Sequence, residues 1–100
     1  MLRTTRKVLT VICEAGLESR LTEDLMRLGA RGYTVTDARG RGSRGVRNAA
    51  WDTAANIRLE VVCEEHIAQK IAEHLQERYY DNFAMILFSA TVEVLRPEKF

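Results

Sequence analysis

The sequence predicts one α+β domain in which an antiparallel sheet carries two helices on one of its faces. Its 100 residues suit a single domain, residues 1–100, with a single core. Apolar residues alternate in four segments and recur every three or four positions in two others, which indicates four strands and two helices. The 46% of hydrophobic and 29% of charged residues exclude a disordered chain.

The first half of the chain predicts a strand, a helix and a strand. Residues 7–13 (KVLTVIC) carry apolar groups on both alternate sets, as expected for a central strand that is buried on both sides. The stripe of an amphipathic helix follows at Leu17, Leu21, Leu25 and Leu28. Either Gly29 or Gly32 should end this helix. Residues 33–38 (YTVTDA) alternate again and predict a half-buried or edge strand.

The second half repeats this arrangement in the order strand, helix, strand. Residues 55–63 predict a strand whose polar side carries Arg58 and Glu60, residues 64–80 a second helix, and residues 84–95 a long last strand. Short connections and right-handed crossovers then lead to the ferredoxin-like βαββαβ sandwich, with both helices on one face of the sheet.

The last strand predicts self-association. One of its two side-chain sets is apolar throughout: Ile86, Phe88, Ala90, Val92 and Val94. We expect its other, mixed set, with Met85 and Leu87, to lie on the face without helices, together with an apolar set of the first strand. Soluble monomers of this size rarely expose so much apolar surface. The sequence therefore predicts a homo-oligomer formed through that face.

Charge and cysteine spacing exclude several classes of protein. The 15 Lys and Arg against 14 Asp and Glu give a net charge of +1, so any anion site must be local. The apolar run 8–13 is too short for a signal peptide or a membrane span, and we expect a cytoplasmic protein. Cys13 and Cys63 lack metal-site spacing and are expected to be buried thiols, at the same end of neighbouring parallel strands.

Residues 39–47 (RGRGSRGVR) form the most unusual stretch, with four arginines, three glycines and no acid. Glycines let backbone N–H groups turn toward an anion, and guanidinium groups bind phosphate oxygens in pairs. Composition alone leaves open whether this is a phosphate-binding loop or a solvated basic tract. Trp51 is either packed on its own subunit or an anchor for a partner.

The titratable residues give no sign of a metal site or a catalytic centre. His66 and His74 would be separated by about 12 Å along a helix, too far to share one ion, and both are expected on the surface. Ser43 lacks a local histidine and Asp81 lies in a turn-like stretch, so an enzyme is the less favoured class.

Four segments carry a family resemblance: 32–35 (GYTV), 40–47 (GRGSRGVR), 55–60 (ANIRLE) and 80–84 (YDNFA). Together they resemble the PII-like signalling proteins, especially the branch that regulates bicarbonate uptake or accompanies carboxysome genes. The similarity extends from about Lys7 to Leu95. It implies a homotrimer with adenine nucleotides in the clefts between neighbouring subunits, and residues 40–53 match the mobile T-loop that presents the ligand state to a partner protein.

The resemblance also implies the residues of a nucleotide site. They are Thr34, Val35, Gly40, Gly42, Ser43, Arg44, Arg47, Arg58, Glu60, Met85, Ile86 and Leu87. The first two would line the adenosine pocket, and the glycines would let the chain pass close to the nucleotide. Arg44 and Arg47 would bind phosphate, Arg58 and Glu60 would face the cleft, and residues 85–87 would border the base from the adjacent subunit.

One departure from the nitrogen-sensing members affects the ligand. Residues 81–84 (DNFA) hold neither the glycines nor the lysine that cradle a triphosphate in those members. The resemblance therefore implies AMP, ADP or cyclic AMP rather than ATP, alone or together with bicarbonate, and a target that is a bicarbonate transporter or a carboxysome-linked protein. Two other functions remain as alternatives: an RNA-binding module that uses the RG-rich loop, and a small hydrolase of the acylphosphatase type.

Overall fold

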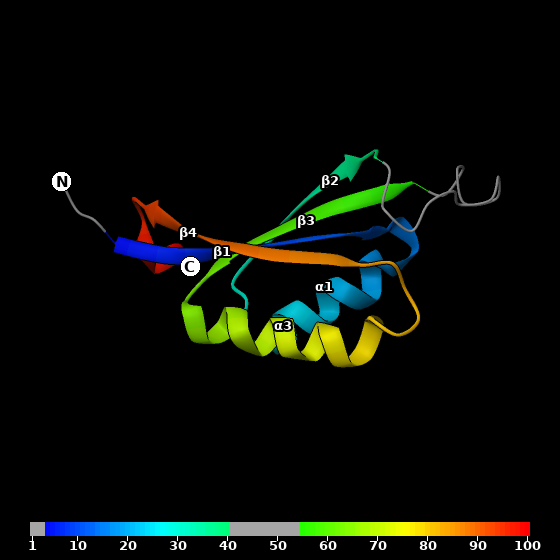
Figure 1. Cartoon of the computed structure of the whole chain (residues 1–100). Helices are drawn as coiled ribbons and strands as arrows, with labels where there is room; N and C mark the ends of the chain where they lie inside the picture. The colour runs from blue at the N-terminus through cyan, green and yellow to red at the C-terminus, as the bar shows by residue number, and fades with distance from the viewer. Residues whose placement is uncertain (1–3, 41–54) are drawn as a thin grey trace.

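The computed structural model of the chain describes residues 4–40 and 55–100. They form a sheet with two helices on one side of it, and the ends of the described chain lie near each other (Figure 1). The elements in order are β1 (Thr4–Glu14), a 3₁₀ turn η1 (Ala15–Leu17), α1 (Glu18–Arg27), β2 (Thr34–Ala38), β3 (Asn56–Cys63), α3 (Glu65–Tyr79), β4 (Ile86–Val94) and a second 3₁₀ turn η2 (Pro97–Lys99).

The sheet has the strand order β2-β3-β1-β4, and every neighbouring pair is antiparallel. β1 is thus central, as its two apolar sets predict. Together with the element order, this arrangement confirms the ferredoxin-like βαββαβ sandwich. Each predicted element is present, and the bounds differ from the predicted ones by three residues or fewer.

The core lies between the sheet and the helices. Leu9, Val11, Leu59 and Val61 project from the central strands toward the helices and are almost fully buried. The helices cover them with Leu21, Leu25, Ile71, Leu75 and Tyr79, none of which is measurably exposed. Burial of each such side chain contributes about 1.5–3 kcal/mol. These residues belong to one continuous apolar cluster that joins both helices to the sheet.

Gly29, one of the two glycines predicted to end α1, is the one that does so. Its φ of +115° lies in a backbone region that residues other than glycine rarely adopt. A Cβ on Gly29 would also lie 2.9 Å from Cδ1 of Ile67 on α3. Glycine at this position therefore lets the chain turn from α1 toward β2 and lets the two helices approach closely.

The prediction for the faces of β4 was wrong. Leu87 is paired with Val11 and packs against the core, and Met85 is 7% exposed within it. Ile86 and Phe88 instead point away from the helices and are 50% and 48% exposed. Alternation shows which side chains share a face, but the neighbouring strand decides which face the helices cover. The side of the sheet that carries no helices, which we call the open face, therefore does expose apolar surface, but this surface comes from the set of β4 that includes Ile86 and Phe88.

The cysteine geometry also differs from the prediction. β1 and β3 are antiparallel, with Cys13 opposite Ile57 and Cys63 opposite Lys7. The two thiols are buried as expected, but they lie about 20 Å apart along the strands at ~3.4 Å per residue. A disulfide requires Cα atoms within about 7 Å, so the two cysteines cannot pair within one chain.

Among residues 4–40 and 55–100, no helix has the length and apolar character that a membrane crossing requires.

Candidate functional site

Polar side chains gather on the open face of the sheet where β2 and β3 lie side by side. Arg58 and Glu60 are two residues apart on β3 and therefore point to the same side. Nη2 and Nε of Arg58 donate to Oε2 of Glu60 at 3.0 and 3.3 Å. Thr36 is paired with Arg58, and Thr34 with Glu60. We call these four residues the polar strand cluster.

The polar strand cluster is accessible to a ligand. The side chains of Arg58 and Glu60 are 44% and 41% exposed, so water screens their ion pair, and such pairs stabilise a fold by only about 0–1 kcal/mol. The pair supplies an anionic acceptor and a cationic donor on one small patch. Chemically, this arrangement suits a ligand that carries hydroxyl groups and an oxyanion.

Ile86 lies on the same face as this cluster. Ile12 of β1 is paired with Arg58 on one side and with Ile86 on the other, so a row across the sheet runs Thr36, Arg58, Ile12, Ile86. The adjacent row runs Thr34, Glu60, Thr10, Phe88. The open face therefore changes from polar at β2 and β3 to apolar at β4.

The structure separates the remaining candidates into three groups. Val35 is half-buried and packs against the core, so it faces the helices, as Met85 and Leu87 do. Only the backbone of these residues is available to a ligand on the open face. Gly40 is exposed, and an added Cβ would meet no atom within 4 Å. A third group lies outside the described residues: Gly42, Ser43, Arg44, Arg47 and Trp51.

Sequence reasoning missed a polar network between the two helices. Asp24 of α1 is 7% exposed. Its Oδ2 accepts a hydrogen bond from the hydroxyl of Tyr79 at 2.8 Å, and its Oδ1 accepts one from Nη2 of Arg27 at 2.9 Å. Nε2 of His74 lies 3.2 Å from Oδ2, and Nε of Arg78 lies 4.0 Å from it. Asp24 directly precedes Leu25 of the leucine stripe, which is the signal that could have indicated its burial.

The network shifts the pKa values of its two acids in opposite directions. Burial by itself raises the pKa of Asp24, but hydrogen bonds from Arg27, Tyr79 and His74 outweigh it, and the pKa falls below its ordinary value. Burial and the neighbouring Asp24 carboxylate raise the pKa of Tyr79. At neutral pH the tyrosine is therefore a hydrogen-bond donor to an ionised carboxylate.

The histidines differ from each other. The side chain of His66 is 68% exposed, in agreement with the prediction, whereas that of His74 is only 24% exposed and belongs to the network around Asp24. The prediction of a surface residue was therefore wrong for His74. Within the described part of the chain, no three His, Cys, Asp or Glu residues come together as metal ligands.

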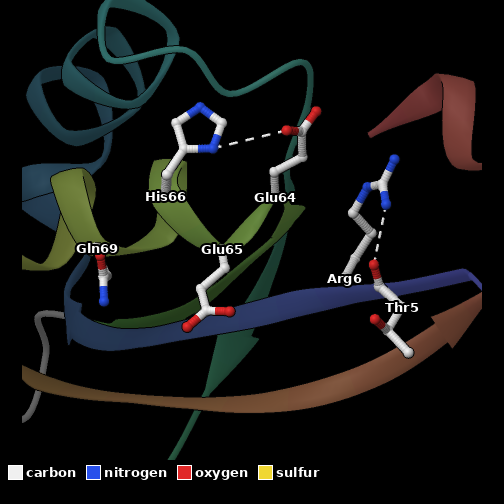
Figure 2. Close-up of a pocket in the computed structure, with 6 residues that line it drawn as sticks. All are labelled: Thr5, Arg6, Glu64, Glu65, His66 and Gln69. Carbon is white, nitrogen blue, oxygen red and sulfur yellow. Dashed lines mark hydrogen bonds and ion pairs between the residues drawn. The ribbon is translucent and has the colours of Figure 1, made fainter.

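A hollow lies at the end of the sheet opposite to the polar strand cluster. Figure 2 shows this open pocket of about 620 Å³, which the start of β1 and the first turn of α3 line with Thr5, Arg6, Glu64, Glu65, His66 and Gln69. Arg6 is six residues from Ile12 along β1, about 20 Å from the row that contains Arg58. The pocket is thus separate from the polar strand cluster.

The structure is thus a ferredoxin-like domain with an exposed cluster of polar side chains where β2 and β3 pair. Comparison with family models gives the family: the model of nitrogen regulatory protein P-II matches residues 6–99. The chain therefore belongs to the P-II family and is a PII-like regulatory protein, as the sequence segments indicate. The family is one of regulatory proteins.

Solved structures agree with this assignment. A PII-like signalling protein from Thermus thermophilus is 45% identical, with a TM-score of 0.85 over 100% of this chain and 99% of that chain. CPII from Thiomonas intermedia, bound to ADP, AMP and acetate, is 25% identical, with a TM-score of 0.86 over 100% of this chain and 98% of that one. CPII bound to ADP and bicarbonate is 26% identical, with a TM-score of 0.86 over 99% and 97%.

Proposed function

We propose that this chain senses adenine nucleotides with few phosphates, namely AMP, ADP or cyclic AMP, alone or together with bicarbonate. The observation that carries the proposal is the accessible pair of Arg58 and Glu60 on the open face beside the β2–β3 connection. The carboxylate of Glu60 can accept hydrogen bonds from ribose hydroxyls, and the guanidinium of Arg58 can donate to a phosphate or bicarbonate oxygen. The ligands of CPII, which include ADP, AMP and bicarbonate, support this class of ligand.

The site requires more than one subunit. Ile86 and Phe88 leave about half of their side chains exposed next to the half-buried Val8 and Ile12. A second copy that covers this apolar half would create a cleft at the edge where the polar strand cluster begins. We propose a homotrimer with three such clefts, in which residues 85–87 of one subunit border the base that its neighbour holds.

The signal would arise in residues 40–53, the segment that matches the T-loop. Its arginines repel one another, and an anion that pairs with Arg44 and Arg47 lowers the free energy of an ordered arrangement relative to an open one. Ligand binding therefore selects a loop conformation that a partner protein can recognise. We place this regulation in inorganic-carbon metabolism in the cytoplasm, with a bicarbonate transporter or a carboxysome-linked protein as the target.

Calorimetric titration tests the ligand class. AMP, ADP, cyclic AMP and ATP are titrated with and without bicarbonate into protein whose oligomeric mass has been measured by light scattering. We expect AMP, ADP or cyclic AMP to bind more tightly than ATP and than GMP. Arg44→Ala and Arg47→Ala should each weaken AMP binding about tenfold, the effect of one charge-assisted contact to phosphate. Unchanged affinities in both variants would refute the phosphate role.

The two alternative functions give different results in the same samples. An RNA-binding module would bind single-stranded RNA with an affinity that falls steeply as salt rises, without preference for adenine mononucleotides. A hydrolase of the acylphosphatase type would release phosphate from an acyl phosphate. The proposed sensor releases none.

A further inference from the structure

The C-terminal residue of α3 links the network around Asp24 to the start of β4. The hydroxyl of Tyr79 donates to Asp24 at 2.8 Å, and both side chains are buried. The carbonyl oxygen of the same tyrosine accepts hydrogen bonds from the amides of Asn82 at 3.2 Å and Phe83 at 2.9 Å. Its ring also lies 5.9 Å from the ring of Phe83, tilted by 60°. One residue thus holds the turn that follows α3 by three contacts.

This turn determines where β4 begins. Phe83 packs on the core, and Met85 is buried directly before Ile86, the first residue of the strand. Within the turn, Tyr80, Asp81 and Asn82 are exposed, so the contacts of Tyr79 and the packing of Phe83 anchor it. Its placement therefore depends on Tyr79, whose hydroxyl is held in turn by the carboxylate of Asp24 that accepts its hydrogen bond.

Asp24 is rigidly placed for this role. Arg27, on the same helix, donates to its other oxygen, and His74 and Arg78 approach it from α3. A buried carboxylate with this many donors has little freedom to rotate, because each lost contact would leave a buried charge without compensation.

We propose that Asp24 and Tyr79 are positioning residues that fix residues 80–85 and thereby set the preference for adenine at the neighbouring subunit's site. The inference rests on the proposed function, in which residues 85–87 border the base. The hydrogen bond between the helices does not touch the ligand. It holds residues 85–87, which border the base, at the distance from the neighbouring subunit's site that adenine requires. Small displacements of a binding group reduce affinity strongly.

The test uses the full-length protein and three variants. Tyr79→Phe removes only the hydroxyl, and Asp24→Asn removes the charge but keeps an acceptor. Thr22→Val is the control, because it removes another hydroxyl of α1, whose hydrogen bonds go to the carbonyls of Glu18 at 2.9 Å and Ser19 at 3.2 Å next to it in the chain. AMP, adenosine and GMP are titrated into each protein well below its unfolding temperature.

We expect Tyr79→Phe to weaken AMP and adenosine binding by the same factor of about three to ten, the effect of one hydrogen bond. The ratio of AMP to GMP affinity should fall, a change that a loss of global stability would not cause. Asp24→Asn should give a smaller change of the same kind, and the double variant should be less than additive. Thr22→Val should bind like the wild type. Unchanged base preference in a folded Tyr79→Phe protein would overturn the proposal.

Hydrogen exchange separates this inference from the proposed function. In Tyr79→Phe, the amides of Asn82 and Phe83 should exchange about three to ten times faster relative to those in the β1–β3 ladder. If the wild type binds no adenine nucleotide, the proposed function fails, and the adenine preference fails with it. If the wild type binds AMP but these amides exchange at unchanged rates in the variant, the positioning role itself is wrong.

Discussion

Asp24 illustrates how the groups around a buried charge can compensate for its burial. The carboxylate is nearly inaccessible to water, and its burial is compensated by the hydroxyl, guanidinium and imidazole groups around it. Removal of the charge leaves three donors with a weaker acceptor, whereas in the intact network the hydrogen bonds outweigh the effect of burial on the carboxylate.

The lowered pKa of Asp24 gives a pH dependence of known sign. The native state holds the carboxylate ionised to lower pH than the unfolded chain, whose value is 3.8, so the contribution to stability is present above that value. It is lost as the pH falls from there through the native pKa. The free energy of unfolding in urea, measured at pH 6 and between pH 4 and 3, should fall more on acidification for the wild type than for Asp24→Asn. Equal losses in the two proteins would contradict the assigned pKa shift.

The two cysteines should be unreactive in the folded protein. Burial, and to a smaller extent the adjacent Glu14 and Glu64, raise the pKa values of Cys13 and Cys63 to about 11. Only the thiolate reacts, so iodoacetamide at pH 8 should modify neither thiol until the chain unfolds. Mass spectrometry after labelling with and without urea measures this. Rapid labelling of the native protein would show that the thiols are not buried.

At the scale of elements, α1 and α3 meet where Gly29 leaves no room for a side chain. We expect Gly29→Ala to destabilise the protein by at least about 1–2 kcal/mol, because the backbone is left-handed there and the methyl group would lie 2.9 Å from Ile67. Gly32→Ala is the matched control: no atom lies within 4 Å of its added Cβ, and its φ is not left-handed. Its unfolding free energy should change by less than about 0.5 kcal/mol.

The elements themselves could be predicted from local pattern. The leucine stripe of α1 and the alternation in β3 follow directly from helical and strand geometry, and Gly29, one of the two glycines predicted to end α1, lies two residues after its last residue. Such patterns repeat along the chain and need no knowledge of the partner elements. The same alternation places Arg58 and Glu60 on the polar side of β3, opposite Ile57, Leu59 and Val61, whereas their role in a ligand site was indicated only by the family resemblance.

The relative direction of neighbouring strands, the face to which each side-chain set points, and contacts between distant elements could not be predicted in this way. The period of β4 is the same whichever face Leu87 occupies, and only its pairing with Val11 decides the question. The separation of Cys13 and Cys63 depends on the reversal of the chain between β2 and β3. The bond between Asp24 and Tyr79 joins residues 55 apart in the sequence, which no local period encodes.

At the scale of the whole molecule, the apolar half of the open face predicts how copies associate. Phe88→Asp should lower the oligomeric mass, because it places a charge where a second copy would exclude water. Met26→Asp is a matched control, since Met26 of α1 and Phe88 are each 48% exposed. Size-exclusion chromatography with light scattering compares the two variants.

We expect the Met26 variant to keep the mass of the wild type and the Phe88 variant to shift toward that of one chain. A wild type that is monomeric at all concentrations, or a Phe88 variant with unchanged mass, would show that the open face is not the contact surface.

The rows that cross the open face run from the threonines of β2 to Ile86 and Phe88 of β4 without a gap. The surface through which copies associate would therefore directly adjoin the ligand site. If the proposed trimer forms, thermodynamic linkage requires that dilution of the protein reduce its apparent affinity for a mononucleotide, and saturation with that mononucleotide should slow the exchange of subunits.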